Sequence, residues 1–137
     1  MIDDGKEIAT AAKRARDEGR IEDALDGYAR AAEVARQQGN SLVLAHRLRH
    51  IGDIHQDAGR DAEAAPFYAE ALALYRANPE RLDLDLANML RPLAMLKEKA
   101  GDLAGAKALW AEAAALYEAA GVEIGAKESA RRLAALG

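Results

Sequence analysis

Apolar residues recur along the chain at the three- and four-residue spacing that is typical of α-helices. After Gly19, for example, Ala24, Tyr28 and Ala31 are separated by steps of four and three residues. Such steps place the three side chains on one face of a helix. The same spacing returns further along the chain, so the pattern predicts a repeated helical unit.

Three segments align with one another without a gap, beginning at Gly19, Gly59 and Gly101, at intervals of about 40 residues. Each segment carries a glycine, an alanine five residues later, an aromatic residue four further on and another alanine after three more. A second periodic segment precedes each glycine, and its stripe recurs once more near the C-terminus. Each unit is therefore predicted to be a helix, a turn at glycine and a second helix, because glycine enters the left-handed region at low cost.

This pattern predicts an all-α protein of three helix hairpins and one closing helix. The predicted helices cover residues 3–18, 22–38, 41–58, 61–77, 80–99, 103–120 and 123–136. One domain over 1–137 is expected, with repeats at 3–38, 41–77 and 80–120 and a capping helix at 123–136. Ser41 is predicted to cap its helix, and Pro92, in mid-helix, is predicted to kink residues 88–92.

The glycine, alanine, aromatic, alanine series resembles the second half of a tetratricopeptide repeat (TPR). The residues that resemble its first half are Leu48, Ile51, Gly52, Leu90, Leu93 and Ala94. The usual repeat has about 34 residues, and the longer interval is similar to the longer-helix version of kinesin-light-chain-like proteins. The resemblance implies a right-handed α-α superhelix, or solenoid. It also implies a non-enzymatic adaptor or scaffold that binds other proteins.

Composition agrees with a soluble helical protein. Half of the residues are hydrophobic, mostly alanine, whereas aromatic residues make up 4% and cysteine is absent. The core must therefore form by close approach of small residues, without disulfides. The net charge is −4, no window approaches the length of about 20 apolar residues that a membrane span requires, and the start lacks a secretory signal. A cytoplasmic location without a membrane partner is expected, and the abundance of alanine and arginine is associated with a bacterial source.

The unused positions of the first helices identify the expected groove, because first helices line the concave side of such a solenoid. One position across the stack carries three arginines in register, Arg49, Arg91 and Arg131. Since arginine binds carboxylates bidentately, the expected partner is an extended acidic segment or a C-terminal carboxylate. The predicted groove residues are Lys6, Lys13, His46, Arg49, His50, Asn88, Arg91, Met95 and Arg131. In the alternative interpretation, the arginines pair with Asp53, Glu98 and Glu128.

His46 and His50 are four residues apart on one helix face, which is a spacing of metal ligands. A metal is not predicted, because no glutamate lies between them in a His-Glu-x-x-His motif and no third distant histidine is present. The two imidazoles predict instead an affinity that changes near pH 6. No phosphate loop, nucleophile motif or dinucleotide fingerprint is found. Neither an enzymatic activity nor a cofactor is expected.

A second hypothesis is a self-associating scaffold. The closing helix has no second helix after it, which would leave Ile124 and Leu136 uncovered. A homodimer through this helix is therefore the alternative to peptide binding. Nucleic acid is not an expected partner, because a base-reading pattern and groove aromatics for base stacking are both missing.

Overall fold

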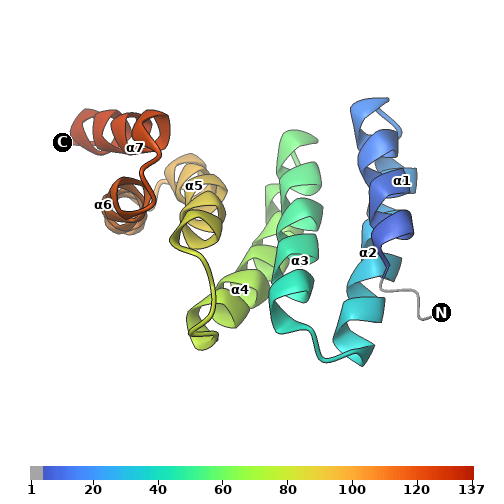
Figure 1. Cartoon of the computed structure of the whole chain (residues 1–137). Helices are drawn as coiled ribbons and strands as arrows, with labels where there is room; N and C mark the ends of the chain where they lie inside the picture. Colours follow the sequence, from blue (N-terminus) through green and yellow to red (C-terminus); the bar gives the residue numbers. More distant parts are fainter. Residues whose placement is uncertain (1–4) are drawn as a thin grey trace. The chain divides into compact units, whose positions relative to one another are not determined.

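The structure, a computed structural model, describes residues 5–137. These residues form α-helices and the connections between them. The helices are α1 (Lys6–Asp17), α2 (Ile21–Gln37), α3 (Ser41–Asp57), α4 (Asp61–Ala77), α5 (Asp83–Lys99), α6 (Leu103–Ala119) and α7 (Glu123–Ala135) (Figure 1). Each predicted helix is present, and the predicted start at residue 3 lies outside the described residues. None of the described helices has the length and apolar content that a membrane crossing needs.

The chain forms two compact units. The N-terminal unit ends at Asn78 and contains α1 to α4, and the C-terminal unit is Pro79–Gly137 and contains α5 to α7. Within each unit, every helix packs against the next one along the chain. The division of 1–137 into one domain of three repeats and a cap stays a prediction.

The turns inside the hairpins are made by glycines in the left-handed conformation. Gly19, Gly59 and Gly101 have φ angles of 77°, 76° and 81°. At the first turn, the Gly19 N–H donates to the Arg16 carbonyl at 3.0 Å and the Arg20 N–H donates to the Ala15 carbonyl at 2.8 Å. These bonds satisfy carbonyls at the end of α1, and a left-handed residue permits them. The predicted role of the glycines is confirmed.

The cap of α3 lies one residue before the predicted position. The Asn40 side-chain oxygen accepts a hydrogen bond from the Val43 N–H at 3.2 Å, and Ser41 is the first residue of the helix. The prediction of Ser41 was wrong because asparagine and serine are both good N-caps and the sequence places them side by side. Pro92 lies inside α5, which continues from Asp83 to Lys99, and the kink stays a prediction.

The core combines alanines with larger aliphatic side chains and with at least one buried aromatic ring in each hairpin. Ala24, Ala64 and Ala106 are fully buried, and the rings that follow them are buried too, with Tyr68 and Trp110 at 0% exposure. Small side chains let helix axes approach closely, and the ring fills the space beside them. The aromatic residues are therefore packing residues, as the sequence predicted.

Candidate functional site

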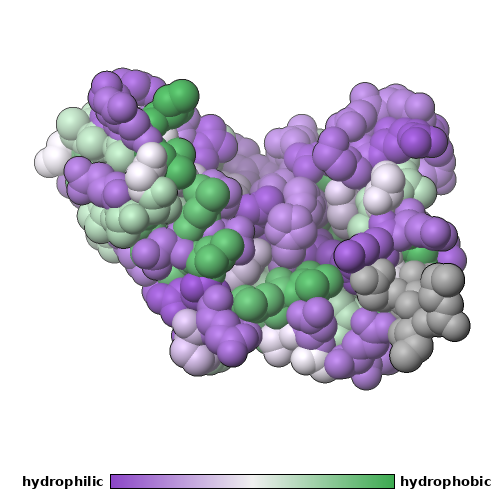
Figure 2. Space-filling view, in the orientation of Figure 1, coloured by the Kyte–Doolittle hydropathy of each residue, from purple (hydrophilic) through white to green (hydrophobic). Residues whose placement is uncertain are grey.

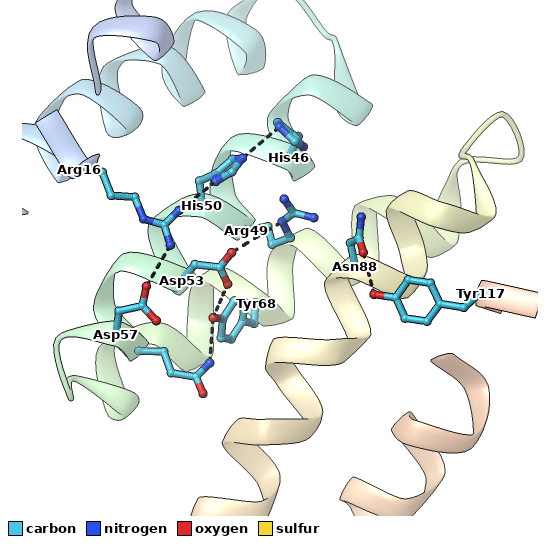
Figure 3. A network of polar contacts seen from close by, with 10 residues as sticks. Arg16, His46, Arg49, His50, Asp53, Asp57, Tyr68, Asn88 and Tyr117 are labelled. Atoms are coloured by element: carbon cyan, nitrogen blue, oxygen red, sulfur yellow. Dashed lines mark hydrogen bonds and ion pairs between the residues drawn. The ribbon is translucent and has the colours of Figure 1, made fainter. Parts of the chain in front are cut away.

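Basic and imidazole side chains gather on the first helices of the N-terminal unit. Steps of three and four residues along α3 place its polar side chains on one face, beside the end of α1. These residues and a tyrosine from α4 form a network of hydrogen bonds and ion pairs (Figure 3). The members of this network, called here the polar cluster, are Arg16, His46, Arg49, His50, Asp53, Asp57 and Tyr68.

Arg16 connects α1 to α3 in the polar cluster. Its Nη2 donates to Asp57 Oδ2 at 3.0 Å, and its Nη1 lies 3.4 Å from His50 Nδ1. A guanidinium only donates hydrogen bonds, so Nδ1 of His50 accepts, and the proton of the neutral ring must be on Nε2. That Nε2 then donates to His46 Nε2 at 3.0 Å. The chain of donors runs from Arg16 through His50 to His46.

His50 is held in its neutral form. Its ring stacks on Tyr28, with centroids 5.1 Å apart. Burial lowers the pKa of His50 to about 3, and the positive charge of Arg49 adds to this effect, as do His46, Arg16 and Lys13 in decreasing order. The expectation that both imidazoles titrate near pH 6 was therefore wrong for His50, because the sequence does not show how deeply the ring is buried.

The direction of these hydrogen bonds disfavours a metal on the two histidines. A metal held by both Nε2 atoms would need the lone pair of His50 Nε2, and the proton would have to move to Nδ1. That nitrogen faces the Arg16 guanidinium. Ligating histidines usually donate their second ring N–H to an acceptor such as a carboxylate. A guanidinium has only donors, so it cannot accept this hydrogen bond. No group of three metal-ligating side chains is found between residues 5 and 137.

Arg49 has a loose contact with a carboxylate that is already engaged. The Tyr68 hydroxyl donates to Asp53 Oδ1 at 2.6 Å and accepts from Gln56 Nε2 at 2.9 Å. Arg49 Nε lies 3.8 Å from Asp53 Oδ2, which is too long for a hydrogen bond. Burial raises the pKa of Asp53, and burial together with the Asp53 charge raises the pKa of Tyr68 well above its usual value.

Arg91, at the corresponding position of the C-terminal unit, is tightly paired. Its Nε and Nη2 donate to the two carboxylate oxygens of Glu128 at 2.5 and 3.1 Å. This bidentate bond lowers the pKa of Glu128. Glu98 accepts from Trp110 Nε1 at 2.7 Å and from Arg132 Nη1 at 3.4 Å. Glu98 and Glu128 therefore bind arginines, as the alternative interpretation of the sequence expected.

The other predicted groove residues are distributed over both units. Lys6 and Lys13 are exposed on α1, and Lys13 pairs with Asp17 at 3.2 Å. Asn88 accepts a hydrogen bond from the Tyr117 hydroxyl at 2.7 Å. Met95 packs against the buried cluster of Ala94, Ala106 and Trp110, and Arg131 is exposed on α7. The structure brings Lys13, His46, Arg49 and His50 together, whereas the register of the three arginines across the units stays a prediction.

The two residues predicted for self-association differ in their surroundings. Ile124 is 86% exposed, whereas Leu136 is partly buried against the cluster that contains Trp110. Figure 2 shows apolar residues among hydrophilic ones on the part of the surface that the C-terminal unit forms. Leu136 is therefore not left uncovered, and Ile124 is the exposed apolar side chain of the pair.

Sequence reasoning missed the hydroxyl of Tyr68 and the carboxylate of Asp57. The ring of Tyr68 was predicted to pack, but a buried tyrosine hydroxyl needs a hydrogen-bond partner, and that need could have indicated a polar residue such as Asp53 nearby. Asp57 lies four residues after Asp53, so the helical spacing already placed both carboxylates on one face.

The comparisons with known proteins decide the family. Residues 10–77 match the family model of the tetratricopeptide repeat. These residues belong to the tetratricopeptide repeat family. No curated protein is similar enough in sequence to match this TPR chain.

Solved structures of other proteins have a similar fold. The structure of BtubC (BKLC) from P. vanneervenii is 17% identical, with a TM-score of 0.69 over 94% of this chain and 61% of that one. A Podosopora anserina protein, described as a kinesin light chain with nearly identical TPR-like repeats, is 15% identical. Its TM-score is 0.79 over 99% of this chain and 67% of that one. The TPR chain thus spans about two thirds of the length of these structures.

These similarities confirm the expected fold class, an all-α superhelix of TPR hairpins. The TPR fold is in general a module for protein–protein interaction, and TPR proteins are in general scaffolds without enzymatic activity.

Proposed function

We propose that this TPR chain binds an extended acidic segment of another protein on the surface of its first helices. The observation that carries the proposal is the grouping of cationic side chains on α1 and α3: Arg16 Nη1 lies 3.4 Å from the His50 ring, and Arg49 precedes His50 on α3. Such grouped positive charges attract carboxylates and disfavour cationic partners. The proposed contact residues in the N-terminal unit are Lys6, Lys13, His46, Arg49 and His50.

Two details support a peptide rather than a small anion. The side chains come from successive turns of α1 and α3, so the contacts are spread along a surface. Lys13 and Arg16 lie on α1 and Arg49 lies on α3, so the positive charges come from two helices. An extended segment with several carboxylates matches charges that are distributed in this way.

Calorimetric titration with two synthetic peptides tests the proposed function. We expect acetyl-hexaglutamate amide to bind the whole chain and the neutral acetyl-(Gly-Ser)3 amide not to bind. The affinity should fall between about 50 and about 300 mM NaCl, because screening weakens contacts between exposed charges. Lys13→Glu should weaken the binding of the acidic peptide.

Arg30→Glu is the matched control, because it changes the net charge equally but lies exposed on α2, a second helix. Equal affinity for both peptides, or an equal effect of the Lys13→Glu and Arg30→Glu substitutions, would contradict the proposal.

A second candidate function is self-association through α7. Its supporting observation is the 86% exposure of Ile124. A shallow surface pocket lies beside it, of about 430 Å³, lined by Glu118, Gly121, Val122, Glu123, Ala126, Lys127 and Ala130. A second copy that inserts Ile124 there would form an isologous contact, the commonest arrangement in homodimers.

A further inference from the structure

Arg49 and Arg91 occupy the same position in successive repeats but have different surroundings. Each follows a buried leucine, Leu48 or Leu90, on the first helix of its hairpin. Arg91 forms two hydrogen bonds with the carboxylate of Glu128. Arg49 forms none with Asp53, since the closest approach is 3.8 Å. At the same position of the repeat, Arg91 is hydrogen-bonded to a carboxylate, whereas Arg49 is not.

The lack of hydrogen bonds at Arg49 is costly because the side chain is largely buried. Its side chain is 13% exposed, and its Nε is buried without a hydrogen-bond partner. A buried donor that has lost its water without gaining an acceptor destabilises the folded state. Within the described part of the chain, no acceptor forms a hydrogen bond with the Nε of Arg49.

The neighbours of Arg49 fix which side of the guanidinium remains available. Tyr68 holds the Asp53 carboxylate by the 2.6 Å hydrogen bond, and this carboxylate lies on the Nε side of Arg49. Figure 3 shows the two terminal nitrogens of Arg49 on the side away from Asp53. Those two nitrogens form the planar fork that binds both oxygens of a carboxylate.

The charge around Arg49 favours a singly charged acceptor. The positive charges of Lys13 and Arg16 make the surroundings attractive to anions. Asp53 and Asp57 are also present in the polar cluster, and they would repel a dianion such as a phosphate more strongly than a carboxylate. A carboxylate therefore fits the available nitrogens better than a phosphate.

We propose that Arg49 is the residue that recognises a carboxylate of the bound segment, whereas Arg91 has a structural role and binds Glu128 instead. This inference rests on the proposed function and assigns unequal roles to two residues that the repeat makes equivalent. The carboxylate belongs either to an aspartate or glutamate side chain or to the C-terminus of the partner. Asp53 and Tyr68 are positioning residues that present the terminal nitrogens of Arg49.

Two matched substitutions in the whole chain test this inference, with acetyl-hexaglutamate amide as the probe in calorimetry. Arg49→Gln should weaken binding by about tenfold or more, because it removes a desolvated charged contact. Arg91→Gln should change binding by less than about twofold but lower the melting temperature, because Glu128 loses its partner. Arg49→Lys keeps the charge without the fork and should bind as weakly as Arg49→Gln.

A direct readout follows the N–H resonance of Arg49 Nε by NMR, assigned with the Arg49→Lys variant. We expect this resonance to shift on addition of the acidic peptide. Acetyl-(Gly-Ser)3 with a free C-terminus distinguishes the two carboxylate sources: a shift with this peptide as well would mean that the fork also accepts a terminal carboxylate. A shift with acetyl-hexaglutamate amide alone would assign it to a side chain.

The failure of this inference is distinguishable from the failure of the proposed function. If the wild type binds the peptide and the two substitutions Arg49→Gln and Arg91→Gln weaken binding equally, the inference is overturned and the proposed function stands. The same holds if neither substitution weakens binding. Tighter binding of a phosphoserine peptide through Arg49 would overturn the choice of a carboxylate. No binding of acetyl-hexaglutamate amide to the wild type would overturn both.

Discussion

Single atoms decide how closely the helices approach in the N-terminal unit. Gly52 on α3 faces the ring of Tyr68 on α4, and a Cβ at Gly52 would lie 2.5 Å from the ring carbon Cε1. The ring is fully buried and its hydroxyl is fixed by Asp53 and Gln56, so it has no room to move. The glycine is therefore required by the ring and not by its own backbone conformation.

Gly52→Ala should lower the free energy of unfolding by about 2 kcal/mol, because overpacking a rigid core forces a side chain or the backbone to shift. Urea unfolding followed by circular dichroism measures this change. Ala73→Ser is the control, since it also adds one heavy atom but at an exposed helical position, and it should change stability by less than about 0.5 kcal/mol. An equally small effect of Gly52→Ala would contradict the role of the ring.

The positions of Gly52 and Tyr68 could be predicted from the sequence, because both recur in the repeat register and both lie on apolar stripes. The polar contacts of Tyr68 could not be predicted in the same way. Periodicity identifies the face of a helix that carries a residue, but it does not fix the rotamer that brings one hydroxyl to one carboxylate.

At the scale of the elements, α7 is attached to the C-terminal unit by apolar and charged contacts. Leu133 and Leu136 pack against the buried cluster of Ala94, Ala106 and Trp110. The Arg132 guanidinium lies 5.1 Å from the centroid of the Trp110 ring, a distance suited to a cation–π contact. Arg91 on α5 adds the bidentate bond to Glu128 on α7. A charged pair thus supplements a small apolar contact.

Glu128→Gln should lower the free energy of unfolding by about 1 kcal/mol at pH 7, because Arg91 loses its ionic partner. The pKa of Glu128 is lowered in the folded protein. Its stabilising contribution is therefore present above the pKa of the unfolded chain and is lost as the pH falls through the folded value. The difference between wild type and variant should shrink when the pH is lowered below about 4.

Urea unfolding at neutral and acidic pH measures this difference. Glu123→Gln is the control, because Glu123 forms an exposed pair with Lys127 within α7, where such pairs contribute about 0.3–0.5 kcal/mol. A loss that is the same at both pH values would mean that Glu128 acts through packing and not through its charge.

At the scale of the whole molecule, the second candidate function makes the mass in solution informative. Ile124→Asp should convert a dimer to a monomer if copies associate through α7, because a charge would replace the exposed apolar side chain. Light scattering during gel filtration measures the mass over a range of concentrations. Leu103→Asp, at a 48% exposed leucine on α6, is the control and should leave the mass unchanged. A monomer mass at every concentration would contradict self-association.

The repeat architecture could be predicted from the sequence because it depends on the local spacing of apolar residues. That spacing occurs in each of the three aligned segments. The hydrogen-bond partners of the arginines could not be predicted, because they depend on how the helices pack in three dimensions. Arg49 and Arg91 are equivalent in register, yet only Arg91 has a carboxylate within hydrogen-bond distance of its guanidinium nitrogens. The register therefore predicts which surface is polar, whereas the distances decide which arginine can contact a partner.

The position of Trp110 has a practical consequence. It is the one tryptophan of the chain, and it lies in the C-terminal unit with its indole N–H bonded to Glu98 and its ring beside Arg132. Selective excitation of this indole gives an emission signal that originates in one half of the chain. The fluorescence of Trp110 thus reports on the packing of α7 in the C-terminal unit without any added label.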